Sequence, residues 1–348
     1  MNLDRIGTIV RLELTQRVRS VAWYVLLGVF AVLLLLVTVL SFLAFSSQET
    51  RGGSVYAVVV YFVLLLVVLV SPTLSGNAIN GDRDAATLAP VQVTLATTGE
   101  IVLGKFLAAW VTGLAFLAVA VPFIVASTVA GGVSIATMAI SLLVLIVETA
   151  IVAAIGVALS GILARPLFSV ASTYLVVAAL CVGTLIAFGL SGAVVRSEAT
   201  SSYRSIEFDS QGNPVEPQTC GPWQTDTYEM PRYDYVWWML TPNPFVILAD
   251  ATPATFDRSG YPVDLFSQIK TGMRLAQLPP DLEYVWDDCD RVTQQSSQPA
   301  PRELLDSTVP SWFVGLALQL VLAAGLLWWA WARTRTPARR LPPGTRIA

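Results

Sequence analysis

Residues 99–105, GEIVLGK, have the spacing of a phosphate-binding loop, because they fit the pattern G-x-x-x-x-G-K. In nucleotide-binding proteins this pattern follows a β-strand and continues with a Ser or Thr that ligates Mg²⁺. Here Phe106 takes that position, and a long apolar run follows at once. We therefore reject a nucleotide site in this segment, and no other segment has such a pattern. Any ATP hydrolysis, with its ATP and Mg, is expected on a separate subunit.

Side chains for metal or acid-base chemistry are scarce. The sequence has no histidine and three cysteines, which excludes the usual zinc, Cys-His and Ser-His patterns. We therefore predict no catalytic residue, no metal site and no cofactor bound by this chain.

Glu148 is the one acidic residue in the middle of a predicted membrane span. Ionisable residues at that depth are costly, so they are functional by default and face protein or water. No basic residue lies at a comparable depth. Two interpretations remain open: contact with a transported substrate, or a neutral carboxyl that hydrogen-bonds a neighbouring helix.

Six apolar runs indicate a membrane protein. The chain is 55% apolar and 13% charged, and each run approaches or exceeds the roughly 20 residues that cross a bilayer as a helix. The runs cover residues 21–45, 55–74, 106–126, 135–160, 167–195 and 309–332. Residues 1–20 place apolar side chains at helical spacing among four arginines, which predicts an amphipathic helix in the membrane interface. The sequence therefore predicts an all-α polytopic protein.

The distribution of Lys and Arg predicts the orientation of these spans. Basic residues concentrate in residues 1–20, in the loop 75–105, in the loop 161–166 and in the tail 333–348, whereas the short loops 46–54 and 127–134 contain only Arg51. The positive-inside rule then predicts a protein of the cell membrane (plasma or inner) with both termini in the cytoplasm.

The large insert at residues 196–308 is then extracellular. It holds 17 of the 24 acidic residues but 8 of the 21 basic ones. Cys220 and Cys289 are its two cysteines, and an oxidising exterior favours a disulfide between them.

An apolar stretch at residues 235–249 interrupts this insert. Its candidate residues are Trp237, Trp238, Pro242, Asn243 and Pro244. The two prolines prevent it from spanning a bilayer, and tryptophans are typical of the headgroup level. Two interpretations stay open, namely a short re-entrant or interfacial element, or part of a hydrophobic core of the external domain.

The segment 80–105 resembles the cytoplasmic loop between the second and third helices of ABC-2 type transporter permeases, whose pattern is roughly E-R-E-x-G-T-L-E-x-L-L-x-T-P-x-S-x-x-E-I-x-x-G-K. The residues that carry this resemblance are Asp82, Arg83, Asp84, Thr87, Leu88, Thr94, Glu100 and Lys105. Residues 1–20 likewise look like the elbow helix that precedes the first span in that family, and an Asn-Pro element before the last span is common there.

The resemblance implies the membrane subunit of an ATP-driven exporter. The residues of the 80–105 segment named above would form a coupling helix. This helix would present an exposed face, to which Glu100 contributes, for the docking of cytoplasmic ABC ATPase subunits. Two permease copies, or this chain and a homologue, would form the pathway among membrane lipids; no nucleic-acid partner is expected. An alternative is a permease-like scaffold that uses the same ATPase coupling to drive or recruit an extracellular assembly.

Overall fold

The computed structural model describes most of the chain. The described residues are 2–47, 51–85, 96–129, 131–207, 211, 219–289 and 299–335.

Six helices in this described part are long and apolar enough to cross a membrane. They are α2 (Val21–Ala44), α3 (Arg51–Ser75), α6 (Thr98–Thr128), α7 (Ile135–Ile162), the continuous α8–η1–α9 (Pro166–Val194) and α13 (Trp312–Thr334). The six predicted spans are thereby confirmed, and the chain is a multi-pass membrane protein. The fifth span is not a regular α-helix, because a π-helical turn, η1 (Ala179–Gly183), separates α8 (Pro166–Ala178) from α9 (Thr184–Val194).

Helix α6 begins well before the predicted start at residue 106, and the reason is a capping box. The Thr97 hydroxyl accepts a hydrogen bond from the backbone N–H of Glu100, and Glu100 Oε2 accepts one from the backbone N–H of Thr97 at 2.8 Å. This pairing satisfies two N–H groups that a helix start otherwise leaves without partners. The polar residues before the apolar run are therefore the first turns of the same helix.

Helix α7 lies at the centre of the bundle. Its most apolar stretch is 72% buried inside the protein, compared with 22% for α2 and for α13. It packs against α3, α6 and α13. A Cβ atom at Gly156 would lie 1.9 Å from Ser75 Oγ at the end of α3. Only glycine therefore allows these two helices to approach so closely, as small residues do in other membrane bundles.

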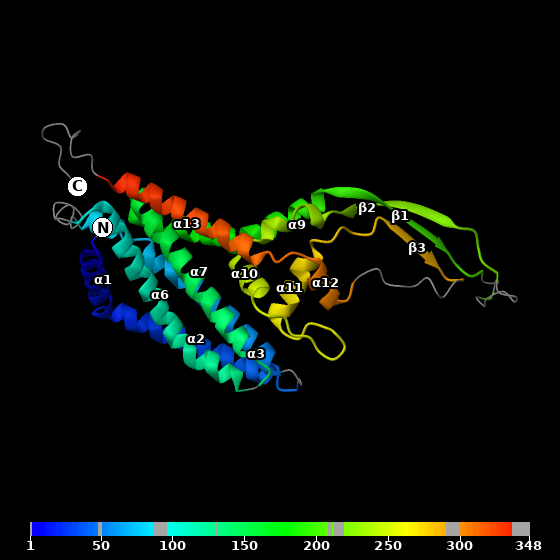
Figure 1. Cartoon of the computed structure of the whole chain (residues 1–348), viewed down its shortest axis with the longest axis horizontal. Helices are drawn as coiled ribbons and strands as arrows, with labels where there is room; N and C mark the ends of the chain where they lie inside the picture. The colour runs from blue at the N-terminus through cyan, green and yellow to red at the C-terminus, as the bar shows by residue number, and fades with distance from the viewer. Residues whose placement is uncertain are drawn as a thin grey trace.

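The two ends of the bundle differ. Figure 1 shows α1 (Leu3–Val18) and the end of α13 at one end, and the β-sheet projecting beyond the opposite end. Helix α1 packs along α6, and it leaves Leu3, Leu12 and Val18 exposed on different sides of the helix.

The insert between α9 and α13 contains a sheet, so the prediction of an all-α protein is wrong for this part. The strands are β1 (Arg196–Arg204), β2 (Gln224–Pro231) and β3 (Glu283–Asp287), in the order β2–β1–β3. Strand β1 pairs antiparallel with β2 and parallel with β3. The central strand, RSEATSSYR, has short polar side chains where a half-buried strand would alternate apolar and polar residues. Its sequence therefore gives no strand signal.

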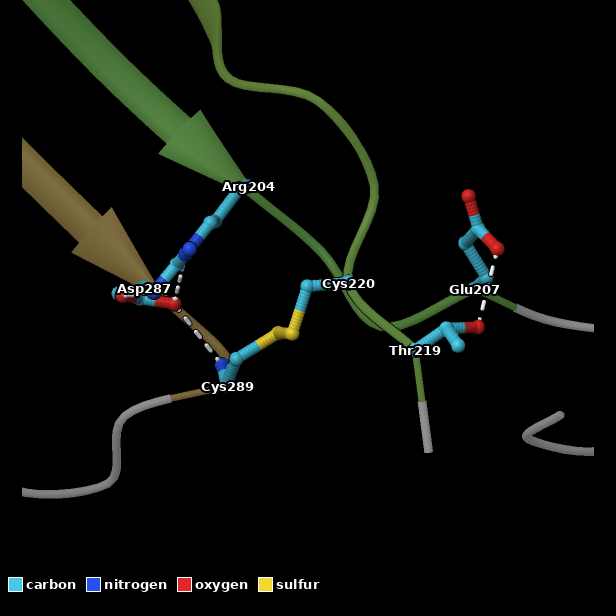
Figure 2. The surroundings of a disulfide bond; sticks show 6 residues. All are labelled: Arg204, Glu207, Thr219, Cys220, Asp287 and Cys289. Atoms are coloured by element: carbon cyan, nitrogen blue, oxygen red, sulfur yellow. Dashed lines mark hydrogen bonds and ion pairs between the residues drawn. A yellow bond between two sulfur atoms is a disulfide. The ribbon is translucent and has the colours of Figure 1, made fainter. Parts of the chain in front are cut away.

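The disulfide between Cys220 and Cys289 confirms the predicted pair. The bond links the segment before β2 to the segment after β3, and the chain-entropy model gives such a closure roughly 4 kcal/mol. Figure 2 shows the ion pair beside it, in which Arg204 of β1 approaches Asp287 of β3 with an Nε to Oδ1 distance of 2.7 Å. The same Asp287 oxygen accepts the backbone N–H of Cys289 at 3.0 Å. The distal end of the sheet is thus closed by one covalent bond and one ion pair.

Short helices join the sheet to the bundle. They are η2 (Tyr233–Tyr235), η3 (Trp237–Leu240), α10 (Pro244–Ala251), α11 (Leu265–Leu275) and α12 (Pro301–Ser307). Asp250 of α10 accepts hydrogen bonds from two neighbouring elements. Its Oδ1 accepts one from Arg274 Nε of α11 at 2.8 Å, and its Oδ2 accepts one from the backbone N–H of Trp312 at 3.0 Å. Asp250 and Arg274 are 0% and 3% exposed at their side chains. One buried carboxylate therefore fixes α10, α11 and the start of α13 together.

We expect the substitution Asp250→Ala to lower the free energy of unfolding by about 3–5 kcal/mol, because it leaves the Arg274 guanidinium buried without its counter-charge. Thermal and denaturant unfolding of the purified protein in nanodiscs would measure it. Glu229→Ala is the matched control, since Glu229 pairs with Arg196 at the exposed surface and such pairs contribute about 0.2–1 kcal/mol. Equal losses in the two variants would contradict this role of Asp250.

Candidate functional site

The segment that resembles a coupling helix starts where α3 ends, at the short helix α4 (Asn80–Asp84). Ser160, near the end of α7, holds this turn, because its Oγ accepts the backbone N–H groups of Ile79 at 2.9 Å and of Asn80 at 3.0 Å. Arg83 adds a second tie to α7 through the carbonyl of Leu163 at 3.3 Å. Helix α4 is therefore anchored to the central helix by a buried hydroxyl and a guanidinium.

Lys105 joins three elements at this end of the bundle. Its Nζ lies 2.6 Å from Glu13 Oε1 of α1 and 2.6 Å from Asp82 Oδ2 of α4, and Lys105 itself belongs to α6. The Lys105 side chain is 3% exposed, whereas Glu13 is 17% and Asp82 33% exposed. A nearly buried ammonium group is thus held between two carboxylates that still reach water.

Glu100 ties the start of α1 to α6. Besides closing the capping box, it accepts the backbone N–H of Asn2 at 2.6 Å and lies 3.9 Å from the Arg5 guanidinium. Further along α1, Arg17 donates to Thr112 Oγ1 of α6 at 2.8 Å and to the carbonyl of Leu74 of α3 at 3.0 Å. Polar contacts therefore fasten α1 to the bundle at both of its ends.

The predicted coupling residues do not share one exposed face. Glu100 and Lys105 are 2% and 3% exposed, so the expectation that Glu100 lies on a docking surface is corrected; its carboxylate is occupied within the chain. Arg83 is half-buried, and Asp84 is exposed. Thr87, Leu88 and Thr94 lie outside the described residues.

Glu13 belongs to this cluster, although the sequence did not single it out. The available signal is one acidic side chain near the middle of a helix that also carries Arg5, Arg11 and Arg17. Its partner, Lys105, is distant in the sequence, so spacing alone could not pair the two.

A second polar cluster lies inside the bundle, around Glu148 of α7. Glu148 and Gln319 of α13 are each 1% exposed, and their side chains lie close together. Gln319 also donates its amide N–H to the carbonyl of Pro242 at 2.9 Å. Among the described residues, neither Glu148 Oε1 nor Gln319 Oε1 has a hydrogen-bond partner. A carboxyl group that keeps its proton supplies the missing donor to Gln319 Oε1.

The Asn-Pro turn next to this cluster fastens the π-helical turn of the fifth span. Asn243 donates to the carbonyl of Cys181 in η1 at 2.7 Å and to Thr184 Oγ1 at 2.9 Å. Its own Oδ1 caps α10 by accepting the backbone N–H of Phe245 at 2.9 Å. Cys181, the free cysteine of the described part, contributes only its backbone here.

The apolar stretch 235–249 packs among the long helices. Helix α10 contacts α7 and α13, and the Phe245 ring stacks on Tyr61 of α3 at a centroid distance of 6.0 Å. Pro244 and Asn243 are buried, Trp237 is half-buried and Trp238 is 56% exposed. These contacts favour the re-entrant interpretation over a separate core of the external domain.

The described residues offer no metal site. No group of three or more His, Cys, Asp or Glu side chains in that part is arranged to hold a metal ion. Searches with protein-family models and among curated proteins find no match to this chain.

We expect Lys105→Met to lower the free energy of unfolding by about 2–3 kcal/mol, because it leaves the carboxylates of Glu13 and Asp82 facing each other without a counter-charge. Unfolding in nanodiscs would measure the change. Lys270→Met is the matched control, since the Lys270 ammonium group donates to the carbonyl of Thr252 and pairs with no carboxylate in the described part of the chain. Adding Glu13→Gln to Lys105→Met should restore part of the loss, and the absence of any restoration would contradict the pairing.

Substitutions of Glu148 should separate a neutral carboxyl from a charged one. We expect Glu148→Gln to keep stability within about 1 kcal/mol, because an amide of the same shape can replace a neutral carboxyl group beside Gln319. Glu148→Leu should lose about 1–3 kcal/mol, because it removes the polar neighbour of a buried amide group. Equal losses from both substitutions, measured by unfolding in nanodiscs, would show that a charged Glu148 is required.

Proposed function

We propose that this chain is the membrane subunit of an ATP-driven exporter of the ABC-2 type. Separate ATPase subunits hydrolyse ATP in the cytoplasm, and the chain couples that hydrolysis to the outward movement of a substrate. The observation that carries the proposal is the segment 80–105: its residues match the family pattern, and its two ends are built into α3, α6, α7 and α1.

The orientation in this proposal follows from charge. Basic residues of α1, α4, the start of α6 and the end of α13 gather at one end of the bundle, and the acidic insert lies at the other end (Figure 1). The positive-inside rule then assigns the termini to the cytoplasm. The disulfide supports the same orientation, because such bonds persist in oxidising compartments outside the cytoplasm.

The contacts around α4 provide a route for mechanical coupling. An ATPase that pushes on this helix displaces Asp82, which is paired with Lys105 of α6, and Asn80, whose backbone is held by Ser160 of α7. Both receiving helices are long enough to cross the membrane. Helix α1 moves with them because Glu13 shares the same lysine. Movement at the cytoplasmic surface thereby reaches the membrane helices as a unit.

Two copies of the chain, or the chain and a homologue, complete the pathway in this proposal. Helices α2 and α8–η1–α9 are only 22% and 17% buried within one copy. Their exposed apolar faces are available to lipid and to a second permease. The re-entrant α10 and the Glu148 cluster then lie beside the fifth and sixth spans.

The test is recovery of an ATPase with the tagged full-length chain from its native cells. Asp84 is exposed next to the predicted docking segment, so Asp84→Arg combined with Leu88→Asp should abolish co-purification of an ABC ATPase while membrane insertion stays normal. Arg83 is less suitable, because its guanidinium bonds Asn80 and Leu163 within the chain.

Asp306→Arg is the matched control. It makes the same charge change as Asp84→Arg, at an exposed position of α12 on the insert, and should leave ATPase recovery unchanged. If the wild-type chain recovers no ATPase, or if the double variant recovers as much as the wild type, this proposal is wrong.

A further inference from the structure

A cavity of about 510 Å³ lies where the insert meets the fifth span. Its walls come from α9, β2, η2, the end of α11 and β3. The side chains that matter here are Phe188, Tyr228, Met230, Tyr233, Leu275 and Tyr284. The volume is within the range of small-molecule sites, and an aromatic and aliphatic lining is typical of them.

The aromatic lining continues along one face of the sheet. Tyr228 and Tyr284 flank the central strand at Ala199 and Ser201, which are their register partners in β1. Cross-strand partners share a face, and the next position on that face of β3 is Trp286, which stacks on Tyr284 at a centroid distance of 6.3 Å. The aromatic surface of the cavity therefore continues along β3 to Trp286, whose register partner in β1 is Tyr203.

Helix α9 of the fifth span forms one side of the cavity. Phe188 belongs to α9, and its ring lies 5.1 Å from that of Tyr233 in the insert. The cavity therefore borders a helix that is long enough to cross the membrane. Tyr228 and Tyr284 remain 41% and 46% exposed, so their rings are accessible to a ligand.

Charges around the cavity select the head group of such a ligand. Arg232 binds both oxygens of Asp234, at 2.8 and 2.6 Å, and these bonds hold the pKa of Asp234 below its usual value. That acid is therefore neutralised by its own partner. Asp281 at the rim is exposed, and Asp226 lies on the same face of the sheet as Tyr228. No Lys or Arg is among the described residues that line the cavity, so anionic head groups are disfavoured.

We propose that this cavity and the adjoining sheet face bind a cationic amphiphile, with its alkyl chain between the aromatic rings and its head group at the acidic rim. The ligand enters from the membrane surface at α9. The site does not depend on the proposed ATPase coupling, because every residue in it belongs to the insert or to the fifth span.

Photolabelling of the full chain in zwitterionic nanodiscs, without any ATPase, tests this site. The probe is an alkyltrimethylammonium with a diazirine in its chain. We expect saturable adducts on peptides containing Tyr228 or Tyr284, and we expect dodecyltrimethylammonium to compete at least ten-fold better than dodecyl sulfate. Equal competition by the two detergents would overturn the cationic assignment, and an absence of saturable adducts on these peptides would overturn the site.

Gly272→Trp provides the blocking variant. A Cβ atom at Gly272 meets no atom within 4 Å, so an indole ring there extends into the cavity without disturbing α11. The variant should weaken probe binding at least ten-fold while the thermal midpoint and the disulfide are retained. Gly325→Trp in α13 is the matched control, because that glycine also faces open space, and its binding should be unchanged.

Two results with these variants would contradict the proposal. One is probe binding to Gly272→Trp at the wild-type level. The other is displacement of the probe by an uncharged apolar peptide at concentrations at which dodecyltrimethylammonium has no effect, which would identify a peptide groove instead.

Discussion

The close packing of α7 against its neighbours is the constraint on which the rest of the structure depends. At Gly156 the backbone of α7 comes so near to Ser75 that no side chain fits between them. Helices packed at this distance cannot slide independently, because any shift creates overlap or an empty space in a dense interior. Helix α7 also carries polar residues that reach other elements, among them Ser160 toward α4 and Glu148 toward α13. A displacement at one end of the bundle is therefore passed to the Glu148 cluster through a single rigid helix.

The insert is attached to this bundle by buried polar contacts as well as by apolar packing of α10 and α11. Asp250 joins α10 and α11 to the start of α13, and Asn243 joins the same region to η1 in the fifth span. Both side chains are almost fully buried, so water cannot replace a lost partner, and each contact is costly to break. The sheet beyond them has few buried side chains, and its distal end depends on the Cys220–Cys289 bond. Buried polar contacts thus hold the insert where it joins the bundle, and a disulfide closes the far end of the sheet.

The sequence alone predicted those features of the structure that depend on a single physical property. A helix must be about 30 Å long to cross a bilayer, so run length alone predicted the six spans, and an oxidising exterior predicted the disulfide. It was insufficient where the deciding partner is distant in the chain. The burial of Lys105 depends on Glu13, and strand β1 is defined by pairing with β2 and β3 instead of by its own side chains. The family resemblance named residues in the 80–105 segment, but it did not indicate that Glu100 and Lys105 face inward.

That inward position changes how the coupling segment is expected to act. The Lys105 ammonium group lies between the carboxylates of Glu13 and Asp82. Moving either carboxylate away is costly, because it leaves a nearly buried positive charge with less compensation. Asp82 is the more exposed of the two partners, so it is the one that an outside protein can reach. Because the same ammonium group also binds Glu13, a displacement of Asp82 acts on α6 and α1 together.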